Sequence, residues 1–449
     1  MYDIKMKMVI IRIRWLLVAA PTLVLLGTAC TGNAADPDNT ANDAANGDTA
    51  PAETDWEPRE PESHAAAQPR LVVADNDSGA VTLVDAHSGE TTATVDAAGP
   101  TRLTVADNEG AQVLLSGEEA QLLDTGIRWE AHGDHVDPAN EEPELVEGTL
   151  DISASTPATA GDHHAALLGA DESGNNTAVL HELDETVPEE FAATATIDAA
   201  NAEVAVPLGE DLLLGGENDV QVRSTDDTEV ADTTSCASVS SAVALDAEAA
   251  ILGCADGALV AETNGDTVDF EHLAAPDADT PVTGLVAADD PAGPALGSYG
   301  ETAVAVVDPA EQSISEVELP AELAALTWDP YWEQGLALTA DGQLHAIDPE
   351  EAEITTTAEV TETITQDEGH AVVAAGESHV YLLNPDTAEL IEAEVSRDGF
   401  ERTRNLALDF TPADLAVVGL EPLEEPEHET DDHDHDHDHE DEHEDEHDH

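Results

Sequence analysis

The chain has 449 residues, of which 41% are hydrophobic, so it can bury one large core or two ordinary ones. Its 100 Asp and Glu residues against 12 Lys and Arg give a formal net charge of −88 at pH 7. Such a surface repels phosphate backbones, which excludes nucleic acid as a partner. The acidic residues are spread along the whole chain, which indicates adaptation to a salty environment where counterions screen self-repulsion.

The first 30 residues have the organisation of an export signal. Basic residues within 5–14 precede an apolar run over 15–26 that is too short to span a membrane. The small residues G-T-A then lead to Cys30, as in a bacterial lipobox, although Gly27 stands where leucine is usual. We predict that Cys30 is lipidated and anchors the protein to the outer face of the cell membrane; simple secretion is the alternative.

Residues 31–69 consist mainly of Ala, Asp, Asn, Thr, Pro and Glu. Such a segment cannot bury enough apolar surface to offset the entropy lost on ordering. It is therefore predicted to be a disordered acidic linker.

Residues 70–420 contain a recurring pattern, in which turn residues precede a short alternating apolar segment that ends on a polar residue. Its eight copies end at Asp85, Asp124, Asp184, Ser224, Thr263, Asp308, Asp348 and Asn384. Short strands repeated with a period of roughly 40 residues are typical of a β-propeller with one four-stranded sheet per blade. The sequence predicts an all-β fold with a single propeller of eight blades, seven being the alternative.

One interval between copies stands out. Asp124 and Asp184 lie 60 residues apart, whereas the other intervals are 36 to 45 residues. We interpret the excess as an insertion at one blade junction. Loops held by a rigid scaffold commonly carry binding sites, so this insertion is the first candidate for a functional site.

The long interval also holds two histidine motifs, H-G-D-H at 132–135 and G-D-H-H at 161–164. Imidazole and carboxylate are donors that suit zinc or a similar borderline ion, and glycine lets the chain bend around one ion. The candidate ligands are His132, Asp134, His135, Asp162, His163 and His164. The alternative is that these are solvated loop histidines. Most other histidines of this region are isolated, and of these His370 could line the same end of the ring.

Two cysteines, Cys236 and Cys254, lie 18 residues apart in the fifth repeat region. In an exported protein this spacing favours a disulfide, which would contribute roughly 3 kcal/mol by loop-entropy arguments.

The end of the chain, 421–449, changes character again. From Glu427 onward it carries eight histidines and fourteen acidic residues and no apolar residue. Alternating His and Asp cannot form a core but can chelate zinc through many interchangeable donor sets. We predict a disordered metal-binding tail whose central ligands are His433, His435, His437 and His439; a merely solubilising acidic tail is the alternative.

An exported propeller with H-G-D-H, G-D-H-H and an H-x-D-x-H segment resembles the periplasmic zinc metallochaperone family AztD over residues 70–420. The resemblance implies an eight-bladed propeller that holds zinc (Zn2+) and passes it to the solute-binding protein of a zinc ABC transporter. It implies His132, His135 and His163 as the main ligands, completed by Asp134, Asp162 or His164. In that family the H-x-D-x-H segment lies near the N-terminus, whereas here it lies at 433–437.

We therefore expect a monomeric, non-enzymatic zinc carrier. A propeller enzyme such as a lactonase or a quinone-dependent dehydrogenase is the second hypothesis. It would need a catalytic acid or base, or aromatic platforms, and only 3% of the residues are aromatic. A metal-independent scaffold or adhesion propeller is the third.

Overall fold

The structure is a computed structural model that describes residues 55–59, 69–106, 111–132, 135–154, 156–183, 186–230, 234–265, 267–287, 293–365, 370–397 and 399–420. In this part of the chain 35 strands form and no helix does, so no helix long and apolar enough to cross a membrane is found there. The predicted signal peptide with Cys30, most of the predicted linker and the predicted tail with its four histidines lie outside the described residues.

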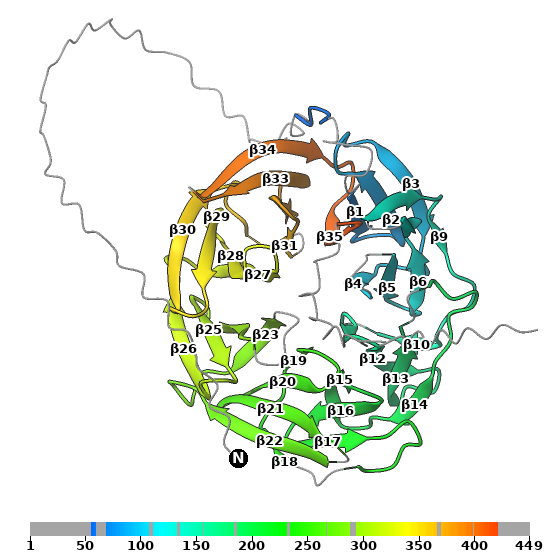
Figure 1. Cartoon of the computed structure of the whole chain (residues 1–449), viewed down its shortest axis with the longest axis vertical. Helices are drawn as coiled ribbons and strands as arrows, with labels where there is room; N and C mark the ends of the chain where they lie inside the picture. Colours follow the sequence, from blue (N-terminus) through cyan, green and yellow to red (C-terminus); the bar gives the residue numbers. More distant parts are fainter. Residues whose placement is uncertain are drawn as a thin grey trace, which may run out of the picture. The chain divides into compact units, whose positions relative to one another are not determined.

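Eight antiparallel sheets are arranged as blades around one axis (Figure 1). Blade 1 contains β35 (Pro412–Val418), β1 (Arg70–Asp75), β2 (Ala80–Asp85) and β3 (Thr91–Asp96). Blade 2 contains β4 (Arg102–Val105), β5 (Gln112–Ser116), β6 (Gln121–Asp124) and β9 (Glu144–Leu145). Blade 3 contains β10 (Ile152–Ser153) and β11 (Thr159–Ala160), which share the first position, then β12 (His164–Asp171), β13 (Asn176–Glu182) and β14 (Ala195–Asp198). Blade 4 contains β15 (Ala202–Leu208), β16 (Asp211–Gly216), β17 (Asp219–Arg223) and β18 (Thr234–Ser235).

The other four blades each contain four consecutive strands. Blade 5 contains β19 (Ser241–Ala244), β20 (Ala249–Cys254), β21 (Gly257–Asn264) and β22 (Thr267–Ala274). Blade 6 contains β23 (Val282–Ala287), β24 (Ala295–Tyr299), β25 (Ala303–Asp308) and β26 (Ser313–Glu318). Blade 7 contains β27 (Leu323–Asp329), β28 (Gln334–Thr339), β29 (Gln343–Asp348) and β30 (Glu353–Glu359). Blade 8 contains β31 (Val372–Ala375), β32 (His379–Asn384), β33 (Glu389–Ser396) and β34 (Gly399–Ala407).

The predicted all-β, eight-bladed propeller is thus confirmed, and the seven-bladed alternative is wrong. Seven of the eight sequence copies coincide with the third strand of a blade. The copy that ends at Asn384 falls on β32, the second strand of blade 8. That shift by one strand explains why the last interval in the sequence is the shortest.

The predicted insertion is real, but its expected place at a blade junction is wrong. The extra residues form a two-stranded hairpin of β7 (Ile127–His132) and β8 (His135–Asn140). This hairpin lies inside blade 2, between its third strand β6 and its fourth strand β9.

The core is divided into eight hydrophobic clusters, one between each pair of neighbouring blades. Both faces of a blade are therefore apolar, and successive residues of a strand pack against the blades on opposite sides. In β1, Val72 and Ala74 pack towards blade 2, whereas Leu71 and Val73 pack towards blade 8. This explains why the buried strands read as nearly continuous apolar runs.

The antiparallel order of the strands defines two ends of the ring. At end A lie the turns that join first to second and third to fourth strands, for example 161–163 and 245–248. At end B lie the turns that join second to third strands, for example 255–256, and the connections between blades. The chain enters β1 and leaves β35 at end A, because β1 is a second strand and β35 a first strand.

The ring is closed within blade 1, where β35 pairs with β1 from Arg70↔Val418 to Asp75↔Pro412. A second connection ties this blade to blade 2. The Leu103 amide donates to Asp414 Oδ2 at 2.9 Å, and the Arg102 guanidinium donates to the Ala413 carbonyl at 2.7 Å. The last strand, β35, therefore binds both β1 in its own blade and β4 in blade 2.

Part of the predicted linker is ordered against the propeller. In the segment Asp55–Arg59, Trp56 is buried between blades 8 and 1, and the Arg404 guanidinium lies 4.2 Å from its ring centroid. Asp55 pairs with Asn405 of β34, and Arg59 reaches Glu392 at 2.9 Å. Gly89, with φ of +73°, makes room for the indole, which a Cβ at this position would meet at 2.2 Å. Within the predicted linker, these five residues thus pack against the propeller.

His379 lies beside this segment, and we expect its titration to lower stability in acid. Burial lowers its pKa from 6.5 to about 4; Glu392 opposes the shift, and Arg59, Arg404 and His87 add to it. Between these two pH values the unfolded chain binds the proton and the folded chain does not. The stabilisation is thus present above pH 6.5 and is lost as the pH falls towards 4.

Guanidinium unfolding at pH 7 and pH 4 measures this effect. We expect the wild type to lose about 2–3 kcal/mol more than His379→Gln between the two pH values. His370→Gln, at an exposed histidine outside the candidate ligands, is the control and should behave like the wild type. An equal pH dependence for the wild type and His379→Gln would show that the imidazole does not titrate in this way.

Candidate metal site

The first histidine motif lies on the inserted hairpin. His132 and His135 are directly opposite partners in the β7–β8 ladder, which places H-G-D-H at the tip of the hairpin. Since the hairpin follows a third strand, it leaves the ring at end A. Asp134, like the side chains of the two histidines, lies outside the described residues.

The base of the hairpin is held firmly to the ring. Arg128 makes a bidentate ion pair with Asp124 at 2.9 and 2.6 Å. Arg70 donates to the Thr125 carbonyl, and the Glu141 amide donates to the Gly126 carbonyl at 2.6 Å. Burial lowers the pKa of Arg70, with Asp85 and Asp124 opposing that shift. The insertion therefore starts from a fixed position.

The second motif, G-D-H-H, forms the tight turn between β11 and β12 of blade 3. The Gly161 amide donates to the His164 carbonyl at 2.9 Å, and the Leu183 amide donates to the His163 carbonyl at 2.7 Å. The His163 side chain is exposed and that of His164 is half-buried. Being a first-to-second turn, G-D-H-H also lies at end A, in the blade next to the hairpin.

Residues of blades 4 and 5 complete the surroundings of this turn. The Ala247 amide of blade 5 donates to Asp162 Oδ2 at 3.1 Å. Residues 161–164 line a hollow of about 10 Å³ together with Pro207, Gly209, Asp246 and Ala247. The Nδ1 atom of His164 is buried, and no hydrogen bond to it occurs within the described residues. Asp162, His163 and His164 thus line one small hollow with a further carboxylate, Asp246, that the sequence did not indicate. Among the described residues, no three of these donors lie within 4.8 Å of one another.

Other predicted residues are placed elsewhere. His370 directly precedes the first strand of blade 8, so it lies at end B and does not line the same end of the ring as the insertion. Cys236 and Cys254 are joined in a disulfide, the pairing predicted from the sequence.

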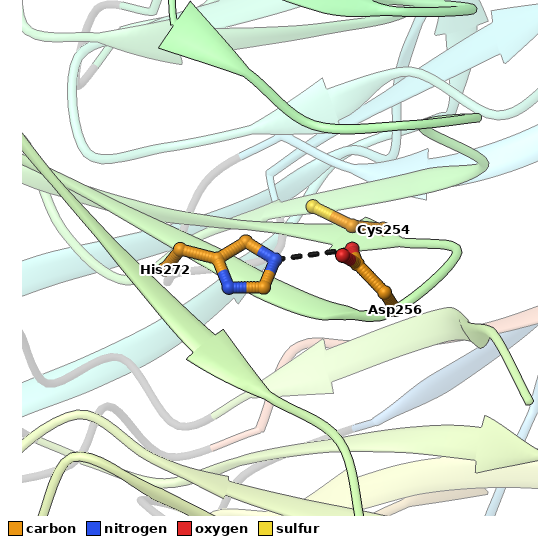
Figure 2. A group of neighbouring side chains, drawn as sticks. All are labelled: Cys254, Asp256 and His272. Carbon is orange, nitrogen blue, oxygen red and sulfur yellow. Dashed lines mark hydrogen bonds and ion pairs between the residues drawn. The ribbon is translucent and has the colours of Figure 1, made fainter. Parts of the chain in front are cut away.

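Sequence reasoning missed one group of possible metal ligands. Cys254, Asp256 and His272 lie together in blade 5, with His272 Nε2 at 3.1 Å from Asp256 Oδ1 (Figure 2). His272 was interpreted as an isolated histidine, because its partners belong to another strand and turn. The only signal in the sequence was the cystine followed two residues later by a carboxylate.

The comparisons with known proteins agree with this architecture. No protein-family model matches the chain. A zinc chaperone from Citrobacter koseri, AztD, is 23% identical over 372 residues, which cover 78% of this chain and 86% of that protein. The crystal structure of Citrobacter koseri AztD covers 80% of this chain and 100% of its own, at 20% identity and a TM-score of 0.71.

The chain resembles AztD over its propeller. The resemblance predicted from the sequence is thereby confirmed. The structure of apo AztD matches nearly as well, with 20% identity, a TM-score of 0.69 and coverage of 80% of this chain and 99% of AztD. At this level of identity the solved AztD structures establish the fold, and the role of each residue must come from its chemistry.

Proposed function

We propose that this protein is an extracytoplasmic zinc carrier, and that it is a metallochaperone rather than an enzyme. The observation that supports the proposal is that the segments carrying the predicted donors belong to the same end of the ring, end A. The hairpin of blade 2, the G-D-H-H turn of blade 3 and the last described residue, Leu420, which precedes the His/Asp tail, all belong to this end. The similarity to a protein named zinc chaperone AztD supports the choice of zinc.

The donor chemistry supports the same cargo. Imidazole and carboxylate without thiolate form the kind of donor set that takes zinc. We propose His132, His135 and His163 as ligands, with Asp134, Asp162 or His164 completing the set. Both turns start from a closed ring, so little conformational entropy is lost when they hold an ion.

The tail has a separate role in this proposal. Alternating His and Asp over 433–439 offers many equivalent donors but no fixed geometry. Each ion bound there would have to order a segment that the sequence predicts to be disordered, so in this proposal the tail binds more weakly than the turns. Zinc then passes by ligand exchange from the tail to the turns, and from the turns to the histidines of a solute-binding protein of a zinc ABC transporter. A lipid on Cys30 would keep the carrier at the membrane beside that transporter.

The ligand assignment is tested by zinc titration against a chelating dye. The chain ending at Leu420 should bind about one zinc ion tightly, because three or four donors from the two turns make one tetrahedral site. The triple variant His132→Ala, His135→Ala, His163→Ala should lose that ion and keep its circular dichroism spectrum. His370→Ala, a histidine at end B, is the matched control and should bind as the wild type does. An unchanged stoichiometry in the triple variant would disprove the assignment.

A further inference from the structure

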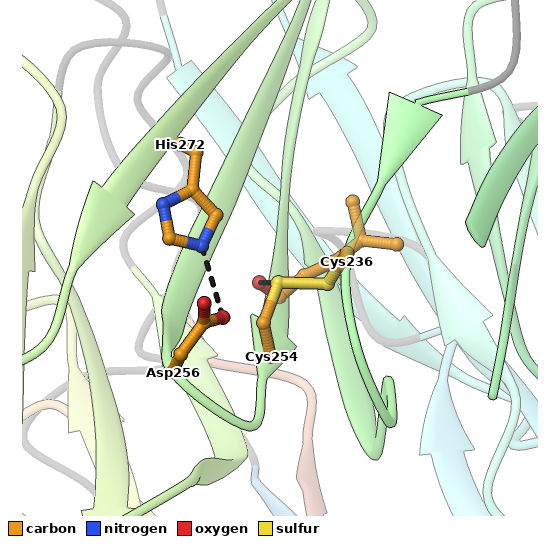
Figure 3. Close-up of a disulfide and its surroundings, with 5 residues drawn as sticks. Cys236, Cys254, Asp256 and His272 are labelled. Carbon is orange, nitrogen blue, oxygen red and sulfur yellow. Dashed lines mark hydrogen bonds and ion pairs between the residues drawn. A yellow bond between two sulfur atoms is a disulfide. The ribbon is translucent and has the colours of Figure 1, made fainter. Parts of the chain in front are cut away.

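A second group of metal-ligating side chains lies in blade 5, at end B of the ring. One donor atom each of Cys254, Asp256 and His272 lies within 4.8 Å of the other two (Figure 2). The Cys254 sulfur is bonded to the Cys236 sulfur, so a fourth potential ligand atom lies beside these three (Figure 3). The four residues include two sulfurs, one imidazole and one carboxylate.

The backbone fixes the segments that carry these side chains. Cys254 and Gly257 close the β20–β21 hairpin, which leaves Asp256 in its tight turn. The Ala255 amide donates to the Ala237 carbonyl at 2.7 Å, which holds the neighbour of Cys236 beside the turn. The Ala275 amide donates to the Asp256 carbonyl at 3.0 Å, which holds the end of β22 with His272 on the other side. The group is therefore held in place before any ion binds.

We propose that reduction of this disulfide creates a tetrahedral site for zinc. Its ligands are Cys236, Cys254, Asp256 and His272. The site stands apart from the proposed function, because it lies at the opposite end of the ring and uses thiolates that the other candidate ligands lack. While the disulfide is intact, neither sulfur can act as a thiolate ligand.

The reaction balances with a dithiol as the reductant. The dithiol transfers two electrons and two protons to the cystine and becomes a disulfide, and the S–S bond is replaced by two thiols. Zinc then displaces the two thiol protons, since only the thiolate coordinates. Zn–S bonds of about 2.3 Å hold two sulfurs about 3.8 Å apart in a tetrahedron, so the two sulfurs, about 2.0 Å apart in a disulfide, must separate by nearly 2 Å after reduction.

The two sides of the site differ in exposure, and the dithiol reaches the buried disulfide when the β20–β21 turn opens locally. Cys254 is fully buried and Cys236 is 2% exposed, so the sulfur side of the site excludes water. The side chains of His272 and Asp256 are 36% and 51% exposed, so they give an ion a path from solvent. Once bound, the ion would also block reoxidation, because both sulfurs would be occupied.

Cobalt(II) is a suitable probe, since thiolate-to-cobalt charge transfer produces an absorption band that histidine and carboxylate ligands do not. The full chain is reduced anaerobically with a dithiol, and peptide mass spectrometry verifies that Cys236 and Cys254 are free thiols. We expect one additional cobalt per chain and a thiolate band in the reduced protein, and no such band in the oxidised protein. Zinc should then displace the cobalt and remove the band.

Variants assign the band to this group. Cys254→Ser should abolish it. His272→Ala and Asp256→Asn, which keep the disulfide and its contribution to folding, should each lower cobalt affinity by about tenfold or more, since even outer-shell changes cost that much. His370→Ala is the matched control and should leave the band unchanged.

Two outcomes would overturn the proposal. The first is a reduced, folded protein that develops no thiolate band. The second is a band whose affinity is unaffected by both His272→Ala and Asp256→Asn. Cobalt bound without a thiolate band would overturn this site and leave the histidine site of the proposed function intact.

Discussion

Ending the chain at Thr411 is expected to unfold the propeller. This truncation removes β35, whose residues Leu415, Val417 and Val418 are buried in the clusters on either side of blade 1. It leaves β1 paired only with β2, exposes the other edge of β1 and opens the ring between blades 1 and 8. The loss should exceed the net stability of a typical domain, about 5–15 kcal/mol.

The matched control is the chain that ends at Leu420, directly after β35. It lacks only the His/Asp tail, and its unfolding midpoint in guanidinium should equal that of the full chain. Circular dichroism and gel filtration of both truncations compare the two cases. A folded, monomeric protein ending at Thr411 would show that seven complete blades and three strands form a stable ring without closure.

Replacement of Glu392 by alanine is expected to have the second largest effect, a destabilisation of about 3–5 kcal/mol. This carboxylate is fully buried and accepts hydrogen bonds from Arg404, from the Thr403 hydroxyl at 2.7 Å and from Arg59 at 2.9 Å. Burial raises its pKa, but the hydrogen bonds from Arg404 and Thr403 and the nearby charges outweigh burial, so the pKa is lowered overall. Without Glu392, the guanidinium of Arg404 remains buried and loses its partner carboxylate.

Glu394→Ala is the control for this experiment. Glu394 lies two residues further along β33, on the same face of the strand, but is exposed. Its replacement should change the unfolding free energy by about 0.5 kcal/mol or less. Equal effects of the two substitutions in urea unfolding would show that the buried ion pair contributes nothing to stability.

The third strands made the fold predictable from the sequence. They combine an apolar run with a polar terminal residue, as in A-V-A-V-V-D of β25, so the repeat can be counted. First strands vary more in length and burial, so they give no such repeat: β19 has four residues, all of intermediate exposure, whereas β35 has seven and is mostly buried. The sequence therefore predicts the number of blades better than the position of each strand within its blade.

The candidate sites were predictable only where their residues are neighbours in the chain. G-D-H-H could be identified because one turn holds all of its donors. The group around Cys254 could not, because His272 reaches Asp256 only through the packing of β22 beside the β20–β21 turn. Trp56 was missed for a related reason: its binding surface is formed by blades 8 and 1, which come from opposite ends of the chain.

Ring closure must also wait until the last strand has been synthesised. Arg70 and its ladder partner Val418 are separated by about 350 residues, so β1 must wait for the ribosome to produce its final neighbour. At about 5–20 residues per second, that wait lasts roughly 20–70 s. A chain that formed its other blades before β35 paired with β1 would present an open arc with an unpaired strand edge, the kind of species that aggregates. Pairing of β35 with β1 is the step that covers this edge.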